Sequence, residues 1–210
     1  MRGGPQGQPM LLAASAAVAP LSRALASGRA PERRTVRTMD VDTAIRTRRT
    51  HKAFAPEPID RATLCELFEL ARWAPNHQLT NPWRFRVLGE RTRAQLAHEA
   101  ELASPGSAKK LDRAPTLVVA SAKLHGDRTE QQEDLLAATI AAYIVLLGAH
   151  ARGLAGYWRT LRVLETAAAR SALAIAADEQ PLGLLHLGHP RQTQRVPDRA
   201  PVEEIASFLD

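Results

Sequence analysis

Apolar side chains recur every three or four residues after position 60, and this spacing predicts an amphipathic helix. Its apolar stripe comprises Leu64, Leu67, Phe68 and Ala71. Asp60 is a suitable N-cap, and Ile59 and Leu64 occupy the hydrophobic staple positions on either side of the first turn. Pro75 should end the helix, because proline lacks the N–H that a helix interior uses.

A polar turn between two prolines, residues 75–83, follows this helix. Trp83, Phe85 and Val87 then alternate with arginines, and this period of two predicts a strand. A second helix, exposed to solvent, is expected at about residues 90–102.

The longest apolar stretch predicts the central helix of the fold. This helix should span about residues 130–152, and a short apolar strand should precede it at residues 117–120. Residues 135–147 are almost uniformly apolar, so most of the circumference of the helix must be covered. Gly153 and Gly156 should end the helix and allow tight turns after it.

Two more core elements and a polar tail are expected beyond these glycines. An Ala-rich helix is predicted at about residues 164–176, and a buried strand at residues 182–187. The last twenty residues carry few apolar side chains before Val202, Ile205, Phe208 and Leu209. Such a tail cannot bury itself, and we expect it to lie across another surface.

Composition indicates one soluble globular domain. A chain of 210 residues is long enough for one domain with a core and short for two. Its residues are 45% hydrophobic and 24% charged, and no apolar run is expected to span a bilayer, so a membrane partner is not predicted. Cys65 is the only cysteine, which excludes an internal disulfide and fits a reducing, cytoplasmic location.

The distribution of charge argues against a nucleic-acid partner. The formal net charge is +6, but residues 1–38 hold six arginines and one acidic residue. The remaining 22 basic and 21 acidic residues leave residues 39–210 almost neutral, at +1. A nucleic-acid-binding domain carries its basic charge on the folded part, so we expect no nucleic acid to bind.

Residues 1–38 are rich in Ala, Gly, Pro, Ser and Arg and are not core-forming. They form either a disordered extension or an upstream sequence joined to a coding region that starts at Met39. A secretory signal is an alternative, because Arg2 precedes a short apolar piece and residues 24–26 offer a small-residue cleavage pattern. An organelle transit peptide is a further alternative. The folded domain is therefore expected at residues 39–210.

A dense cationic cluster occupies residues 46–54, with four Lys and Arg side chains and two threonines. Val41, Ala44 and Ile45 have helical spacing, so the cluster should fall at or just after a helix end. Guanidinium groups bind phosphate oxygens two at a time, and a Thr hydroxyl adds a further hydrogen bond. The cluster is either a phosphate monoester site or a solvated basic surface.

Four motifs in this chain, taken in order and spacing, resemble the FMN-dependent nitroreductase family over about residues 39–199. The resemblance extends to a small subgroup with a His after the Ala-Pro of the first long helix. The motifs are Arg48-Arg49-Thr50, Ala74-Pro75-Asn76-His77 with Pro82-Trp83 close behind, Gly153-Leu154-Ala155-Gly156-Tyr157-Trp158-Arg159, and Leu187-Gly188-His189-Pro190.

The resemblance implies an α+β fold with a mostly antiparallel central sheet and helices on both faces. It also implies a homodimer in which both subunits build each FMN site. Arg48, Arg49 and Thr50 match positions that hold the FMN phosphate and ribityl chain, and Lys52 matches a cation beside the flavin pyrimidine edge. The other matched residues are Trp73 and His77 from the partner subunit, Trp158, Arg159 and Thr160 along the flavin ring, and Gly148, Ala149, His150, Ala151, Arg152 and Gly153 near the nicotinamide cofactor.

The implied activity is a ping-pong transfer of hydride from NADPH or NADH, through FMN, to nitro, quinone or similar acceptors. No protein side chain is required as a catalytic acid or base, and the histidine spacing suggests no metal site. Alternatives are a family relative with another task, such as a dehydrogenase or a flavin-cleaving enzyme, and a flavin-binding protein without turnover. Leu79 and Asn81 depart from the usual family turn, and Arg199 is a poor match for a C-terminal phosphate ligand.

Overall fold

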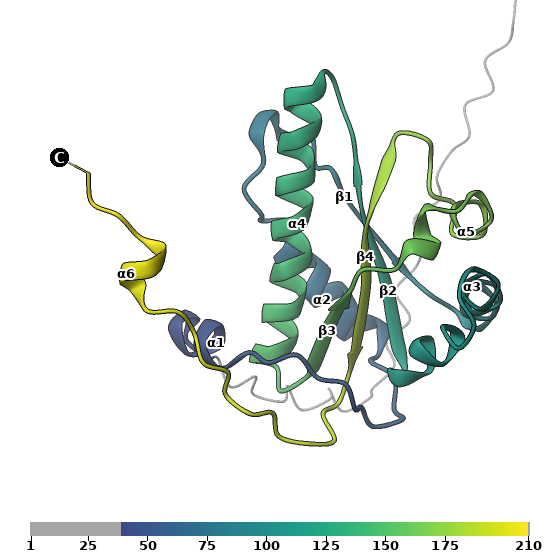
Figure 1. The fold of residues 1–210 in the computed structure, drawn as a ribbon, viewed down its shortest axis with the longest axis horizontal. Coiled ribbons are helices and arrows are strands. Elements are labelled where there is room, and N and C mark those ends of the chain that lie inside the picture. Colours follow the sequence, from purple (N-terminus) through teal and green to yellow (C-terminus); the bar gives the residue numbers. More distant parts are fainter. Residues whose placement is uncertain (1–38, 210) are drawn as a thin grey trace, which may run out of the picture. The chain divides into compact units, whose positions relative to one another are not determined.

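The computed structural model describes residues 39–209, and the predictions for residues 1–38 and for Asp210 lie outside them. Ten helices and strands follow one another along this part of the chain (Figure 1). They are α1 (Val41–Thr47), α2 (Arg61–Ala71), β1 (Trp83–Val87), α3 (Glu90–Ala103), β2 (Thr116–Lys123), α4 (Arg128–Ala151), β3 (Ala155–Arg159), α5 (Ala167–Ala172), β4 (Glu179–Gly188) and α6 (Val202–Ile205). Short 3-10 helices lie at His77–Leu79, Ala108–Arg113 and Arg162–Glu165.

The four strands form one sheet in the order β1-β2-β4-β3. Every neighbouring pair is antiparallel. The register between β2 and β4 shifts once, between Ala120 and Ser121. The predicted antiparallel sheet is therefore confirmed.

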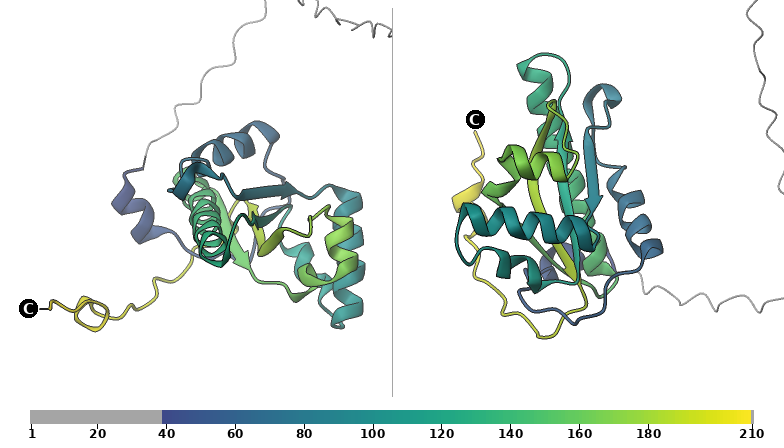
Figure 2. Two further views of the ribbon diagram at one scale, coloured as in Figure 1. Left: turned by 90° about the horizontal axis from the view of Figure 1, so that it is seen from above. Right: turned by 90° about the vertical axis from the view of Figure 1, so that its right-hand side faces the viewer.

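Helices cover both faces of this sheet, and each face has its own apolar core (Figures 1 and 2). On one face, α2 and α4 pack against side chains that include Val118, Leu185 and Leu187. On the other face, α3 and α5 lie side by side over Leu117 and Leu184. The alternation of strand side chains between two faces explains why both cores are apolar.

Local signals in the sequence fix the helix starts as expected. The Asp60 side chain accepts a hydrogen bond from the Thr63 N–H at 2.8 Å, and the staple residues Ile59 and Leu64 are both buried. Asp127 and Glu130 form a capping box at the start of α4. Such caps satisfy donors that the first turn of a helix leaves without partners.

The central helix α4 packs against α2 and the sheet, as predicted. It is the one helix among residues 39–209 that is long and apolar enough to cross a membrane, judged by length and composition. The expectation that no apolar run reaches this length is therefore wrong. Half of the apolar window is buried within the protein, as in the core helix of a soluble protein.

Two elements beyond α4 differ from the prediction. The expected helix at 164–176 is a 3-10 turn followed by the short helix α5, because Thr166 acts as a new N-cap and accepts a hydrogen bond from the Ala169 N–H. The predicted turns after Gly153 contain strand β3, which pairs with β4. Ala and Gly have low strand propensity, and here pairing with a neighbouring strand overrides it.

The C-terminal tail does not bury its own apolar side chains, as predicted, and its packing across another surface stays a prediction. Val202, Ile205, Phe208 and Leu209 are between 63% and 96% exposed. The short helix α6 and the residues after it run away from the sheet (Figure 1).

Candidate functional site

The cationic segment after α1 lies beside β3. Thr50 forms a parallel bridge with Gly156, and the His51 N–H donates to the Gly156 carbonyl at 3.1 Å. At the end of α1, Thr47 Oγ1 lies 2.8 Å from His150 Nε2 at the end of α4. The structure therefore brings together the predicted phosphate segment and the segment at the end of the central helix.

A cavity of about 430 Å³ lies at this junction. Its polar lining comes from three parts of the chain and comprises Thr47, Arg49, His51, His150, Gln192, Thr193 and Gln194. Its remaining lining residues are Met39, Gly153, Leu154, Pro190 and Val196. We call this space the cationic cavity, because the described residues that line it include Arg49 and two histidines and no acidic residue.

Several buried nitrogen atoms around the cationic cavity have no hydrogen-bond partner within residues 39–209. Three belong to lining residues, Arg49 Nε, His51 Nδ1 and Gln194 Nε2, and the fourth is Nε of the adjacent Arg48. A buried donor without a partner costs about 1 to 3 kcal/mol, and most buried polar groups are paired. A phosphate has several acceptor oxygens and would satisfy guanidinium donors at short range. The residues present therefore fit the phosphate of an FMN-like cofactor.

Arg48 and Arg49 are partly held by the protein itself. Arg49 Nη1 donates to the carbonyls of Arg46 and Arg48, at 2.7 and 2.9 Å. The Arg48 guanidinium lies 5.8 Å from the centre of the Tyr143 ring, within range of a cation–π interaction. These contacts orient the two side chains before a ligand binds.

The two histidines of the cationic cavity have lowered pKa values. Burial, followed by the charge of Arg48, lowers the pKa of His51 below its usual value. Burial also lowers the pKa of His150, with further contributions from Arg48, His51 and Arg49. Both imidazoles are therefore neutral near pH 7 in the protein without a ligand.

The next predicted site segment, Trp158 to Thr160, lies at the end of β3 and directly after it. Trp158 packs against the core beneath α4, and its Nε1 donates to the Leu182 carbonyl at 3.1 Å. A Cβ atom at Gly183 would lie 2.6 Å from that nitrogen, so only glycine fits there. Arg159 has a buried nitrogen, Nη1, without a partner among the described residues, and Thr160 is exposed.

The residues of the predicted nicotinamide segment differ in their exposure, and only some of them line the cationic cavity. Gly148 and Ala149 are buried, and a Cβ atom at Gly148 would lie 2.9 Å from the Leu70 side chain of α2. These two residues therefore have no surface for a ligand. Arg152 pairs with Glu66 at 3.2 Å, and Ala151 is half-buried. His150 and Gly153 line the cationic cavity.

Trp73 and His77 lie elsewhere, in the segment after the end of α2. Trp73 is 76% exposed, His77 is also exposed, and neither lines the cationic cavity. Both are thus accessible to a second subunit, and their contact with one, which the family resemblance implies, stays a prediction. Lys52 is exposed and does not line the cavity either.

A buried polar network supports the turn after α2. Thr80 donates to Asp134 at 2.5 Å, and Asp134 also contacts His125 at 2.9 Å. Positive φ angles occur at Gln78, Leu79 and Asn81. Such backbone strain persists only where surrounding contacts hold it, and it often marks ligand-binding segments. No short sequence pattern predicts this network, because its members are far apart in the chain.

The C-terminal side of the cationic cavity was not predicted from the sequence either. Gln192, Thr193 and Gln194 line it, although Arg199 was the residue considered as a C-terminal phosphate ligand. His51 was part of the cationic cluster but received no role. The only signal for the glutamines was their position after the Leu187-Gly188-His189-Pro190 motif.

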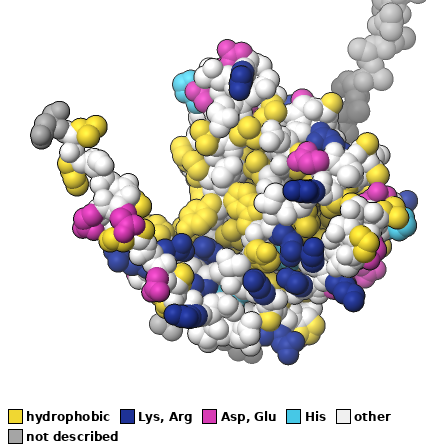
Figure 3. Space-filling model, viewed as in Figure 1, with side chains coloured by type: hydrophobic (Ala, Val, Ile, Leu, Met, Phe, Trp, Pro, Cys, Tyr) yellow, Lys and Arg dark blue, Asp and Glu magenta, His cyan; other side chains and the backbone are white. Residues whose placement is uncertain are grey.

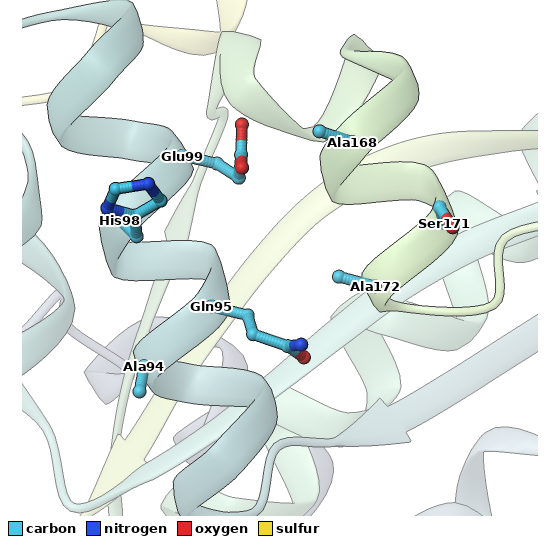
Figure 4. Close-up of a pocket in the computed structure, with 7 residues that line it drawn as sticks. All are labelled: Ala94, Gln95, His98, Glu99, Ala168, Ser171 and Ala172. Atoms are coloured by element: carbon cyan, nitrogen blue, oxygen red, sulfur yellow. The ribbon is translucent and has the colours of Figure 1, made fainter.

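A second cavity, of about 600 Å³, lies between α3 and α5 (Figure 4). It is lined by Ala94, Gln95, His98, Glu99, Ala168, Ser171 and Ala172, and contains none of the predicted site residues. Its walls are mostly short side chains on two helices, and we assign no ligand to it.

Comparison with known proteins agrees with this fold. The sequence model described as Nitroreductase family matches residues 45–189. The chain is 23% identical over 173 residues to the Bacillus subtilis (strain 168) protein named "Putative NAD(P)H nitroreductase YfhC", covering 76% of this chain and 89% of that protein.

Solved structures of nitroreductase-like proteins have the same fold. A nitroreductase-like family protein from Bacillus cereus has a TM-score of 0.74 at 22% identity, covering 82% of this chain and 97% of that one. The FMN and NADPH-dependent nitroreductase NfnB from sphigopyxis sp. strain HMH has a TM-score of 0.69 at 18% identity, covering 82% and 100%. By its family match and its fold, the chain belongs to the nitroreductase family.

Proposed function

We propose that this protein is an NAD(P)H-dependent FMN oxidoreductase that reduces nitro, quinone or similar electron-poor acceptors. The observation that carries the proposal is the set of unpartnered guanidinium and imidazole nitrogens around the cationic cavity, counted within residues 39–209. The name of NfnB, which describes it as dependent on FMN and NADPH, supports the choice of cofactor.

The chain's own residues would bind and orient the cofactor. Arg48, Arg49 and Thr50 would hold the phosphate and ribityl chain. Trp158, Arg159 and Thr160 would lie along the flavin ring, and Lys52 would place a positive charge at its pyrimidine edge. When bound, FMN would accept a hydride from NADPH or NADH and pass electrons to the acceptor in a ping-pong reaction.

The site is proposed to be completed by a second copy of the chain, which would contribute Trp73 and His77. Apolar side chains gather over the outer face of α4, beside a group of Lys and Arg side chains (Figure 3). Leu136, Ile140 and Tyr143 on that face are between 37% and 55% exposed. Together with the apolar tail, this surface favours a homodimer.

Ala151, Arg152 and Gly153 remain the proposed nicotinamide segment, with Gly148 and Ala149 shaping it from beneath; the family resemblance implies the same segment for His150. The physiological acceptor would enter the same open face after the nucleotide has left. The exposed Cys65 accords with a reducing compartment, so we propose a cytoplasmic location.

The function is tested by the absorption spectrum of the purified protein. We expect flavin bands that bleach when NADPH or NADH is added without oxygen, and that return when a quinone or nitroaromatic compound is added. Bound flavin that is not reduced by either nucleotide would favour a flavin-binding protein without turnover. A protein that binds no FMN would contradict the proposal.

The dimer is tested by light scattering on the Ile140→Asp variant. This substitution places a charge in the apolar face of α4, and we expect a monomer with a reduced flavin content. Leu102→Asp is the matched control, because Leu102 is 69% exposed on α3 and outside that face. A wild-type monomer that retains bound flavin would contradict the dimer.

A further inference from the structure

We propose that His51 and His150 are phosphate-binding residues of the cationic cavity, and that each binds the phosphate dianion in its protonated form. The inference rests on the proposed FMN function and assigns two further residues to that site. It also moves His150 from the nicotinamide segment to the phosphate.

Both imidazoles line the same cavity. His51 and His150 line the cationic cavity together with Arg49. The His51 backbone is fixed by its hydrogen bond to Gly156, and its buried Nδ1 has no partner within residues 39–209. His150 Nε2 lies 2.8 Å from the Thr47 hydroxyl, which orients the ring. An imidazolium has two N–H donors, so each ring can donate to a phosphate oxygen once it is protonated.

The charged groups that face these rings explain why a ligand is needed to protonate them. The segment after α1 contributes Arg48 and Arg49, and the C-terminal segment contributes neutral Gln192, Thr193 and Gln194. From α4, Arg152 pairs with Glu66 and is therefore partly neutralised. Burial and the neighbouring guanidinium groups lower the pKa of both histidines, which keeps them neutral in the empty protein.

A bound phosphate dianion would raise the pKa of both histidines again. Two negative charges beside the rings favour the imidazolium form, so binding of FMN should take up protons from solution. The affinity for FMN should therefore rise as the pH falls from about 8 to about 6.5. We expect an increase of up to roughly thirtyfold if one proton is taken up and up to about a thousandfold if two are, since each proton changes affinity by at most about tenfold per pH unit.

The two histidines could instead bind the 2′-phosphate of NADPH. Kinetics of the FMN-loaded protein distinguish this ligand from the FMN phosphate. If His51 and His150 bind the FMN phosphate, substituting them should leave the ratio of the KM values for NADPH and NADH unchanged. If they bind the nucleotide, the KM for NADPH alone should rise. The second result would overturn the assignment to FMN.

The direct test is titration calorimetry of the full chain, stripped of flavin, with FMN in two buffers of different ionisation heat. We expect uptake of between one and two protons at pH 7.5, and an uptake near zero with riboflavin, which lacks the phosphate. His51→Gln and His150→Gln should each reduce the proton uptake and weaken FMN binding by about threefold to tenfold. Glutamine keeps a hydrogen-bonding side chain but cannot become charged.

His98→Gln is the control, because His98 is an exposed histidine on α3 outside the cationic cavity. FMN binding without proton uptake, with a pH-independent affinity, would overturn this inference and leave the proposed function intact. Failure to bind either FMN or riboflavin would overturn both. Circular dichroism of each variant separates a loss of binding from a loss of folding.

Discussion

Two groups of arginines lie on the same chain and differ in how their charges are paired. Arg86 donates to both carboxylate oxygens of Glu179 at 2.8 Å, and to the Ser121 hydroxyl at 2.9 Å. Glu179 is almost completely buried, so this pair is satisfied within the fold. Arg48 and Arg49, by contrast, have buried nitrogens without partners among the described residues, next to a cavity without acidic lining.

The difference separates an arginine that stabilises the fold from the arginines that we propose bind the cofactor phosphate. A buried charge is tolerated when it is paired and hydrogen-bonded. Burial would raise the pKa of Glu179, but the hydrogen bonds from Arg86 and Ser121 and the charge of Arg86 hold that pKa below its usual value. The carboxylate therefore stabilises the fold at neutral pH, and this contribution is lost as the pH falls through the lowered pKa.

The largest effect is expected from Arg86→Met. Removal of the guanidinium leaves Glu179 buried and unpaired, which should lower the free energy of unfolding by about 3 to 5 kcal/mol. Urea denaturation measures the change. Arg72→Met is the matched control, since the Arg72–Glu69 pair is exposed and should contribute little. Equal losses of unfolding free energy in the two variants would show that the buried pair stabilises the fold no more than the exposed pair does.

Arg49→Ala should have the opposite profile, with a small effect on stability and a large effect on cofactor binding. Charged hydrogen bonds contribute roughly 1.5 to 3 kcal/mol, so the affinity for FMN should fall on the order of tenfold to a hundredfold. The affinity for riboflavin should barely change. Fluorescence titration with both flavins measures this difference.

Arg84→Ala is the control for Arg49→Ala. Arg84 Nη1 also donates to two backbone carbonyls, those of Asn81 and Trp83, but Arg84 does not line the cationic cavity. Its substitution should leave FMN binding intact. Loss of FMN binding in both variants would indicate a general structural effect rather than a phosphate contact.

His186 tests whether a buried nitrogen without a partner is sufficient to mark a site. It is fully buried on β4, both ring nitrogens lack partners within the described chain, and it does not line the cationic cavity. Burial, with the charges of Arg159, Arg113 and Arg93, lowers its pKa to about 4. The unfolded chain therefore binds the proton first, and stability is lost as the pH falls from about 6.5 towards 4.

His186→Leu should remove that pH dependence and leave FMN binding unchanged. At pH 5 the wild type should have lost about 2 kcal/mol of stability through this histidine, and the variant should retain it. Denaturation at pH 5 and pH 7.5 measures the difference, with His98→Gln as the control. Weaker FMN binding in His186→Leu would mean that this histidine belongs to the site.

Lys52→Met should have the smallest effect. If the Lys52 charge stabilises the reduced flavin by about 1 to 2 kcal/mol, its loss should lower the two-electron potential by about 20 to 40 mV. FMN should remain bound. A redox titration of the loaded variant measures the shift, and an unchanged potential would show that this exposed lysine faces solvent.

The sequence predicted the features that depend on local patterns. The cap at Asp60, the staple of Ile59 and Leu64 and the central apolar helix all follow from residues close in the chain, and the structure contains them. The position of the cationic segment just after α1 was predicted in the same way.

The sequence could not predict contacts between distant segments. In the sequence, Arg86 is a polar residue of a predicted strand. Its partner Glu179 is 93 residues away, and the two meet only once the sheet has formed. In the same way, His51, His150 and Gln194 come from three segments that no short pattern connects. Strand β3 was missed because its pairing with β4 is a tertiary contact.

The most direct test of the phosphate assignment is ³¹P NMR of the FMN-loaded protein between pH 5 and pH 8. A free phosphate monoester takes up its second proton near pH 6, which moves its resonance. A phosphate held by Arg48, Arg49 and two imidazolium rings should remain a dianion, so its resonance should stay at one position throughout. A bound resonance that titrates near pH 6, as in free FMN, would show that the phosphate lies in solvent and would contradict the account.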